Sequence, residues 1–292
     1  MTAERLETLA FCQAARARGE HALAQTVLDV AIAQLTAADT ATHAALLLER
    51  AELALAAGDL SLADEAARRA GPLAQTAGTP AVMAQAAWLV GQVAWRQLAL
   101  DKARYWLGQA VELALQAELW PVALRAQRGL ANVLAANGDT AGAQARLQAL
   151  AADAQTLELP VEFAACQLDL AQLALAANDG AATLAHLQAA LRAPDSLPPL
   201  LRGEAGLVRA RLLLAIGDTA AAVAAVGEAV ALLRLAGDQR SLGAGLLLQG
   251  QLLLVAGQAE PAGLALGEAL AVTTRAQLPE RAIVEAVIAR LA

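Results

Sequence analysis

The amino-acid sequence predicts an all-α protein, built as a solenoid of seven helix-turn-helix repeats followed by a C-terminal capping helix. Alanine and leucine, two strong helix formers, dominate a chain that is 58% hydrophobic but only 2% aromatic. Turn signals recur at intervals of 39 or 40 residues, and small residues keep fixed positions relative to them. A chain of 292 residues exceeds one ordinary hydrophobic core, and a stacked array of repeats accommodates that length.

Each predicted turn interrupts a run that is rich in alanine and leucine. The turns are Gly19-Glu20, Gly58-Asp59, Leu98-Ala99, Gly138-Asp139, Asn178-Asp179, Gly217-Asp218 and Gly257-Gln258. Glycine adopts the left-handed backbone conformation that ends many helices, and asparagine tolerates it. Leu98-Ala99 contains neither residue, and only the regular spacing places a turn there. We expect each turn to join the two antiparallel helices of one repeat.

Small residues and leucines keep a constant distance from these turns. Seven residues before each turn, the chain carries Cys12, Ala51, Gly91, Ala131, Ala171, Ala210 and Gly250. Five residues after each turn, it carries Ala24, Ala63, Ala103, Ala143, Thr183, Ala222 and Ala262. Nine residues after each turn, it carries Leu28, Ala67, Leu107, Leu147, Leu187, Val226 and Leu266. We expect the small residues to let helix backbones approach and the larger residue to fill the resulting groove, so that neighbouring repeats must stack.

Prolines and capping residues mark the junctions between repeats. The prolines lie near the start of a first helix, where proline is tolerated, at Pro80, Pro121, Pro160, Pro199 and Pro279. Asp39-Thr40 and Asp238 to Ser241 provide capping residues at the remaining junctions. The predicted repeats of one solenoid, 1–292, span residues 3–38, 39–78, 79–119, 120–158, 159–197, 198–237 and 238–278, and the amphipathic capping helix spans 279–292.

Charge and cysteine content exclude several classes of protein. The net charge of −7 leaves no basic stripe, so we expect no nucleic-acid partner. Cys12 and Cys166 lie far apart within helical patterns, which favours a reducing, cytoplasmic compartment. The long uncharged stretches Ala70 to Trp95 and Ser241 to Ala259 stay in register with the repeat, and Gly71-Pro72 breaks the first. We therefore expect no membrane insertion.

The phased small residues, Gly-Asp turns and alanines resemble the tetratricopeptide-repeat family over essentially the whole chain. The usual repeat of that family is about 34 residues long. The longer repeats here resemble those of bacterial signalling proteins of the maltose-regulator type, most closely in the segment from Leu233 to Val272. The resemblance implies a right-handed solenoid that binds a peptide or protein along its concave surface. HEAT-type repeats are the alternative fold, which the Gly-Asp turns fit less well.

We find no constellation of residues that indicates catalysis. The sequence contains no phosphate-binding loop, and His21, His43 and His186 have no ligand partners at metal-binding spacing. The cluster Glu49-Arg50-Ala51-Glu52 is typical of solvated ion pairs on a helix surface. We therefore predict a protein that is not an enzyme and that needs no cofactor or metal ion.

One row of polar residues runs through the otherwise apolar first helices. Six residues before each turn lie Gln13, Glu52, Gln92, Asn132, Gln172, Arg211 and Gln251. The resemblance places this row on the concave surface, where amides can donate to and accept from the backbone of an extended peptide. The alternative is an amide ladder that satisfies itself between repeats.

The predicted centre of partner binding lies on the first helices of repeats three and four. Trp88, Gln92 and Trp95 share one helical face by their spacing, and Arg125, Arg128 and Asn132 share the face of the helix one repeat later. Tryptophan and arginine are enriched in binding hot spots. Glu52 and Gln172 extend the predicted site along the polar row. The alternative is that the tryptophans only fill core space that leucine fills in other repeats.

The leading hypothesis is therefore a non-enzymatic interaction scaffold with a protein or peptide partner. One rival is an effector-sensing regulatory arm, and another is a self-assembling structural element, which would make the chain a homo-oligomer. We also expect repeat seven to be the least stable, because glycines lie within its helices at Gly243, Gly245, Gly250, Gly263 and Gly267.

Overall fold

The computed structural model of the protein describes residues 3–36, 39–278 and 280–290. Those residues form fifteen α-helices and one short 3-10 helix, with no strand among them, so the all-α fold class is confirmed. The helices are α1 (Ala3–Ala17), α2 (His21–Ala33), α3 (Thr40–Ala57), α4 (Leu60–Thr76), α5 (Pro80–Arg96), α6 (Leu100–Gln116), α7 (Trp120–Ala136), α8 (Thr140–Thr156), α9 (Pro160–Ala176), α10 (Gly180–Ala190), α11 (Pro199–Ala215), α12 (Thr219–Ala236), α13 (Gln239–Val255), α14 (Ala259–Arg275) and α15 (Arg281–Ala289).

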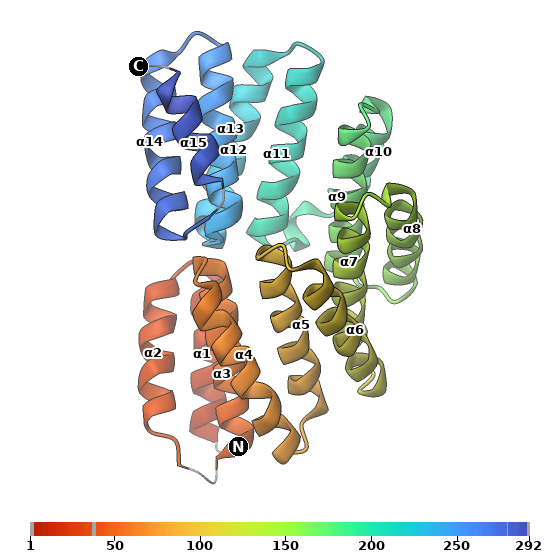
Figure 1. Cartoon of the computed structure of the whole chain (residues 1–292), viewed down its shortest axis with the longest axis vertical. Helices are drawn as coiled ribbons and strands as arrows, with labels where there is room; N and C mark the ends of the chain where they lie inside the picture. The colour runs from red at the N-terminus through yellow and green to blue at the C-terminus, as the bar shows by residue number, and fades with distance from the viewer. Residues whose placement is uncertain (1–2, 37–38, 279, 291–292) are drawn as a thin grey trace. The chain divides into compact units, whose positions relative to one another are not determined.

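The helices gather into two compact units. The N-terminal unit comprises Met1–Leu55 and Asp59–Glu162, and the C-terminal unit comprises Ala56–Gly58 and Phe163–Ala292. Within each unit, consecutive helices pack against each other as hairpins (Figure 1). The first helices of adjacent repeats also touch, α5 against α7 in one unit and α11 against α13 in the other. First helices therefore line up as one layer of each unit.

Left-handed backbone conformations occur at all seven predicted turns. The positive φ angles belong to Gly19 (80°), Gly58 (83°), Leu98 (58°), Gly138 (89°), Asn178 (58°), Gly217 (85°) and Gly257 (74°). Leu98 thus confirms a turn that only the spacing of the repeats had placed. The junctions between repeats use the same conformation at Gly78, Glu118, Glu158, Gly237 and Gln277, which the sequence analysis did not anticipate.

The acidic residue of the Gly-Asp turn caps the helix that follows it. Asp59 Oδ1 accepts a hydrogen bond from the backbone N–H of Leu62 at 2.9 Å, which satisfies a donor that the first turn of a helix leaves open. The same bond, at 2.9–3.0 Å, is made by Asp139, Asp179, Asp218 and Asp238. Glycine therefore ends one helix of the repeat, and aspartate begins the next.

The predicted groove of small residues is present and filled as expected. The residues seven before and five after each turn are all buried, and those nine after each turn are 0–4% exposed. A Cβ added to Gly91 would lie 2.8 Å from both Cγ and Cδ2 of Leu107, and one on Gly250 would lie 2.5 Å from Cγ of Leu266. At these two positions the first helix lies so close to the leucine that an added side chain would force the leucine to move.

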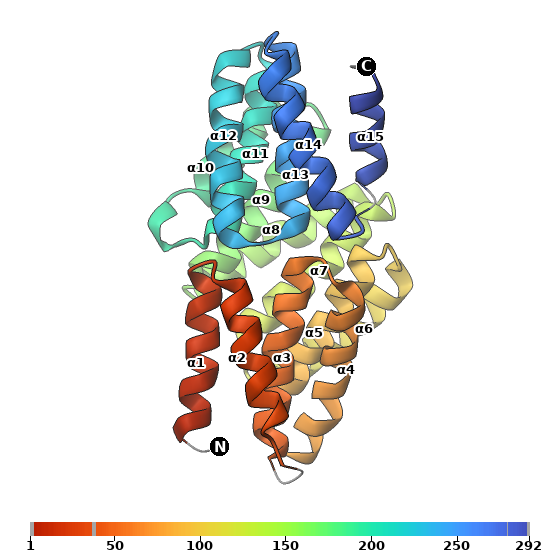
Figure 2. The ribbon, with the colours of Figure 1, turned by 90° about the vertical axis from the view of Figure 1, so that its left-hand side faces the viewer.

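Two elements differ from the expectation, and a third lies where it was predicted. Gly71-Pro72 does not break the helical stretch, because α4 continues through Pro72 to Thr76. The second helix of repeat five is short, and a 3-10 helix, Pro194–Ser196, follows α10. Figure 2 shows α15, the predicted capping helix, as a separate helix at the side of the C-terminal unit; it contacts α14 and buries Val284. Pro279 lies outside the described residues.

One described helix, α12, is long and apolar enough to cross a membrane by length and composition alone. It lies in neither of the two uncharged stretches that the sequence analysis considered. In the structure α12 packs against α11 and α13, and Val226, Val230 and Leu233 are buried in the core of the C-terminal unit.

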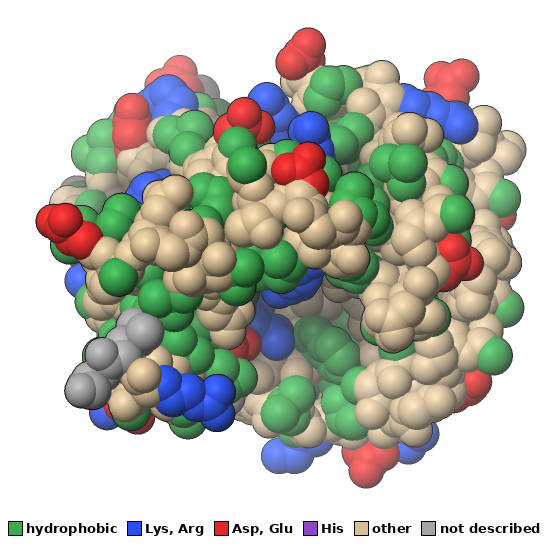
Figure 3. All heavy atoms as spheres, turned by 90° about the horizontal axis from the view of Figure 1, so that it is seen from above, with side chains coloured by type: hydrophobic (Ala, Val, Ile, Leu, Met, Phe, Trp, Pro, Cys, Tyr) green, Lys and Arg blue, Asp and Glu red, His purple; other side chains and the backbone are tan. Residues whose placement is uncertain are grey.

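The charged side chains seen in Figure 3 are scattered singly or in mixed pairs among apolar and uncharged surface.

Candidate partner-binding site

Helical periodicity and the contact between α5 and α7 bring six of the eight predicted binding residues onto two neighbouring helices. Trp88, Gln92 and Trp95 follow each other along α5, and all three are half-buried. Arg125, Arg128 and Asn132 do the same along α7. The half-burial of all six distinguishes them from the fully buried alanines and valines on the same two helices.

Trp88 packs against the hydrophobic core of the N-terminal unit. Its ring packs against three groups of buried residues, which come from α3 to α7. The indole Nε1 is buried and has no hydrogen-bond partner among the described residues. Both observations match the alternative in which tryptophan fills space that leucine fills in other repeats.

Arg125 connects the first helices of three successive repeats. Its guanidinium carbon lies 5.4 Å from the ring centroid of Trp88 on α5, at cation–π distance. Its Nε lies 3.5 Å from Oε1 of Glu162 on α9 and donates to the carbonyl of Pro121 at 3.2 Å. Arg125 is therefore held between an aromatic face and a carboxylate. The sequence analysis did not identify Glu162, because an acid in the first turn of a helix is ordinarily explained by the helix dipole.

Gln92 and Trp95 lie at the contact between α5 and α7. A Cβ added to Gly129 would lie 3.3 Å from Nε2 of Gln92, so the amide rests against the backbone of α7. Trp95 packs against the buried group that includes Leu107 and Val133. Arg128 and Asn132 flank this contact along α7 and take part in polar interactions of their own. The cluster thus joins two amides, two indoles and two guanidinium groups on adjoining helices.

The other two predicted residues have different surroundings. Glu52 on α3 forms an ion pair with Arg16 of α1, with Oε2 and Nη2 2.6 Å apart. Gln172 on α9 is exposed and belongs to the C-terminal unit. The structure therefore brings together the six residues of α5 and α7 and does not add these two to their cluster.

The charged cluster around Glu49 is a correction to the sequence analysis, which expected solvated ion pairs. Glu49 is 3% exposed, and its Oε1 lies 2.8 Å from Nε of Arg16. Burial raises the pKa of Glu49, and the opposing attraction of Arg16 offsets this only in part. A signal was present in the sequence, because nine residues before the other turns the chain carries Ala10, Leu89, Gly129, Asp169, Val208 and Leu248. Only Asp169 shares the charge of Glu49.

The cysteines and His186 lie in buried or half-buried surroundings. No group of three or more His, Cys, Asp or Glu side chains in that part of the chain is placed to hold a metal ion. Cys12 and Cys166 are free and buried, and burial raises the pKa of the Cys12 thiol, which opposes reactivity. Nδ1 of His186 lies 2.7 Å from Oε1 of Gln167, and burial lowers the pKa of His186.

Comparison with known proteins identifies the fold. No protein-family model and no curated protein matches the sequence. The structure is similar to NprR in complex with its cognate peptide NprX (TM-score 0.68, 10% identity, covering 98% of this chain and 86% of that one). It is similar to a Rap protein complexed with Competence and Sporulation Factor (TM-score 0.63, 11% identity, 98% and 97% covered). It is also similar to aspartyl phosphate phosphatase F from Bacillus subtilis (TM-score 0.60, 12% identity, 95% and 71% covered).

Proposed function

We propose that this tetratricopeptide-like helical repeat protein is a non-enzymatic, cytoplasmic interaction scaffold. Its partner is an extended peptide or protein segment, which lies along the layer of first helices. The observation that carries the proposal is the cluster on α5 and α7, where tryptophan, arginine and amide side chains meet at half-buried positions. The chain is only 2% aromatic, and two of its four tryptophans belong to this cluster.

The residues of the cluster have separate tasks in this proposal. Gln92 and Asn132 present amides that can both donate to and accept from a peptide backbone. Trp95 offers apolar surface, and tryptophan and arginine are the side chains most enriched in binding hot spots. Trp88 and Glu162 hold Arg125 in place before the partner arrives. A side chain that is already immobilised loses less entropy on binding.

We propose Glu52 and Gln172 as further partner contacts of the polar row, each within its own unit. Glu52 is already engaged in an ion pair with Arg16, which also contacts Glu49. NprR, whose fold this chain shares, was solved in complex with a peptide, which supports the same class of partner by analogy of fold alone.

Selection from a random peptide-display library against the full chain tests the proposal. Selected peptides should bind Trp95→Ala at least about 30-fold more weakly, which corresponds to about 2 kcal/mol. Gln92→Ala should weaken them in the same direction. The matched control is Trp120→Ala, which removes a tryptophan that is 46% exposed at the start of α7, and it should leave binding unchanged.

Two results would contradict the proposal. One is a library that yields no binder to the folded chain, and the other is a set of binders that tolerate both Trp95→Ala and Gln92→Ala. Circular dichroism of each variant must show unchanged helix content. Mass in solution across a concentration series separates the scaffold from a self-assembling element, because only the latter grows into polymers.

A further inference from the structure

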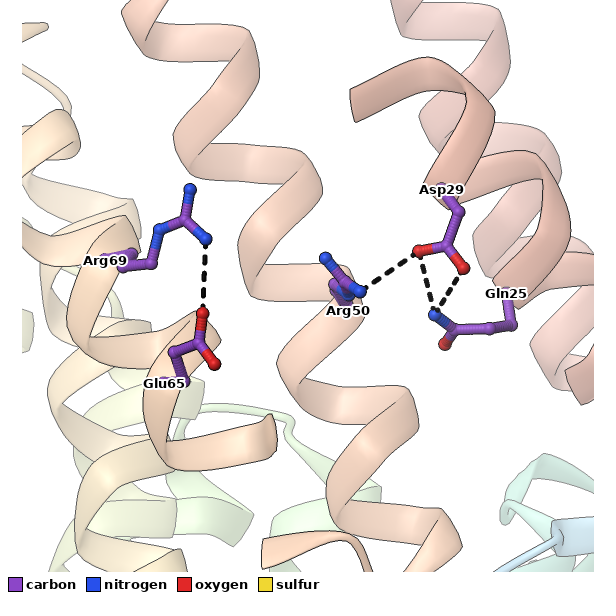
Figure 4. A network of polar contacts seen from close by, with 5 residues as sticks. All are labelled: Gln25, Asp29, Arg50, Glu65 and Arg69. Atoms are coloured by element: carbon purple, nitrogen blue, oxygen red, sulfur yellow. Dashed lines mark hydrogen bonds and ion pairs between the residues drawn. The ribbon is translucent and has the colours of Figure 1, made fainter. Parts of the chain in front are cut away.

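The junction between repeats one and two is built around charged side chains. Arg16 on α1 bridges two acids of α3, with Nε 2.8 Å from Oε1 of Glu49 and Nη2 2.6 Å from Oε2 of Glu52. We call these three residues the Arg16 cluster. A second ion pair joins α2 to α3, since Nη2 of Arg50 lies 3.4 Å from Oδ1 of Asp29 (Figure 4). Both helices of repeat one are therefore attached to α3 through arginine.

The junction also has an apolar part, in which Leu9, Val27 and Ile32 pack partly buried against a fully buried group. Its buried group consists of Cys12, Ala15, Ala24, Leu28, Leu46 and Leu53. Only Leu46 and Leu53 of that group come from α3. The junctions within the C-terminal unit have a larger buried group of leucines, valines and alanines that spans α11 to α15. Repeat one is thus joined to α3 by apolar packing and by ion pairs together.

We propose that repeat one (α1 and α2) is a separately releasable module, held onto α3 by the Arg16 cluster, which undocks while the rest of the N-terminal unit stays folded. Repeat arrays can open locally in this way because each repeat contacts only its neighbours. Undocking uncovers Leu46 and Leu53 on α3.

Electrostatics explains why Arg16 controls the docking. The groups that face Glu49 are Arg16 and Gln13 from α1 and Glu52 from α3. Two carboxylates share one guanidinium group, and the carboxylate of Glu49 is almost fully buried. Removing Arg16 leaves that buried charge beside a second acid without a cation. Removing one partner of a buried ion pair strongly destabilises the folded protein, because the other charge stays buried without compensation. Replacing that remaining charge by a neutral group removes this desolvation cost.

The direction of the pH effect follows from the same contacts. Burial raises the pKa of Glu49, so the docked form takes up a proton more readily than the released form. Docking is therefore strongest below the ordinary carboxyl pKa and weakens as pH rises through the raised pKa. Acid does not release the module, and at neutral pH Arg16 holds it in place.

Hydrogen exchange of the full chain tests the proposal. In Arg16→Met, the opening equilibrium constant of α1 and α2 should rise about tenfold to a hundredfold. This effect is smaller than for a fully buried ion pair, because the Arg16 side chain is 35% exposed. Exchange in α5 to α8 should stay unchanged. The control Arg104→Gln breaks an ion pair between side chains that are 65% and 93% exposed, and it should leave α1 and α2 as they are.

A second variant separates charge from shape. Arg16→Met combined with Glu49→Gln should regain most of the lost protection, and Arg16→Met alone should regain it as pH is lowered. The proposal is overturned if Arg16→Met leaves the exchange of α1 and α2 unchanged. It is equally overturned if α1 to α8 lose protection together, or if the double variant is as open as the single one.

Discussion

The glycines of repeat seven allow a quantitative test of the packing between helices. Gly263 and Gly267 are exposed on α14, and a Cβ at either would meet no atom within 4 Å. Gly250 on α13 is buried, and a Cβ there would lie 2.5 Å from Cγ of Leu266. By residue type alone these glycines are equivalent, whereas the structure predicts opposite responses to the same substitution.

Replacing glycine by alanine in an exposed helix stabilises it by about 1 kcal/mol. Gly263→Ala and Gly267→Ala together should therefore stabilise repeat seven by about 2 kcal/mol. Gly250→Ala gains the same helix propensity, but it forces Leu266 to move, and overpacking costs about 1–3 kcal/mol. The expected net loss is about 1 kcal/mol.

Amide exchange in α13 and α14 measures both effects within the repeat itself, with the N-terminal unit as an internal reference. The double variant on α14 should slow exchange about 30-fold, and Gly250→Ala should accelerate it about fivefold. Faster exchange in Gly263→Ala with Gly267→Ala, or slower exchange in Gly250→Ala, would refute this account of the packing. In the unmodified chain, repeat seven should exchange faster than repeats two to six.

Three further predictions follow from single residues. Leu98→Gly should stabilise the chain by about 1 kcal/mol in thermal unfolding, because Leu98 is 66% exposed and has a positive φ, whereas Leu98→Ala keeps the strain and should not. Arg125→Met should shift the tryptophan emission and lower stability by about 1 kcal/mol, because the guanidinium leaves the Trp88 ring, and an unchanged spectrum would contradict the stacking. Burial lowers the pKa of His186, so stability should fall as pH drops below 6.5, and His186→Gln should remove part of that dependence.

The repeat architecture could be predicted because its signals are local and recur. A left-handed residue, a capping aspartate and small residues at fixed distances identify each helix pair independently of the others. Leu98 is an example: its position in the repeat predicted a turn correctly, although leucine rarely adopts a positive φ. Glu118 and Glu158 show the limit, because nothing in their residue type indicates a positive φ.

The candidate site was predictable as a face but not as a set of contacts. Helical spacing places Trp88 and Arg125 on neighbouring helices, yet the stacking of Arg125 on Trp88 depends on the relative rotation of α5 and α7. The ion pairs of Glu162 and Glu49 could not be predicted for the same reason, because the arginine that each contacts comes from another repeat. A charged residue at a position that is apolar in most repeats is the signal that points to such contacts.

The Gly-Asp turn has a consequence for how such a chain can change in length. In each Gly-Asp turn two adjacent residues end one helix and cap the next. Gly138, for example, has the left-handed conformation, and Asp139 accepts a hydrogen bond from the backbone N–H of Gly142, so no distant segment is needed. A gene segment of about 40 codons that is duplicated or deleted between two such turns therefore carries complete helix ends with it. The array can be lengthened or shortened by recombination in whole repeats, and chimaeras joined at these turns should keep every helix boundary intact.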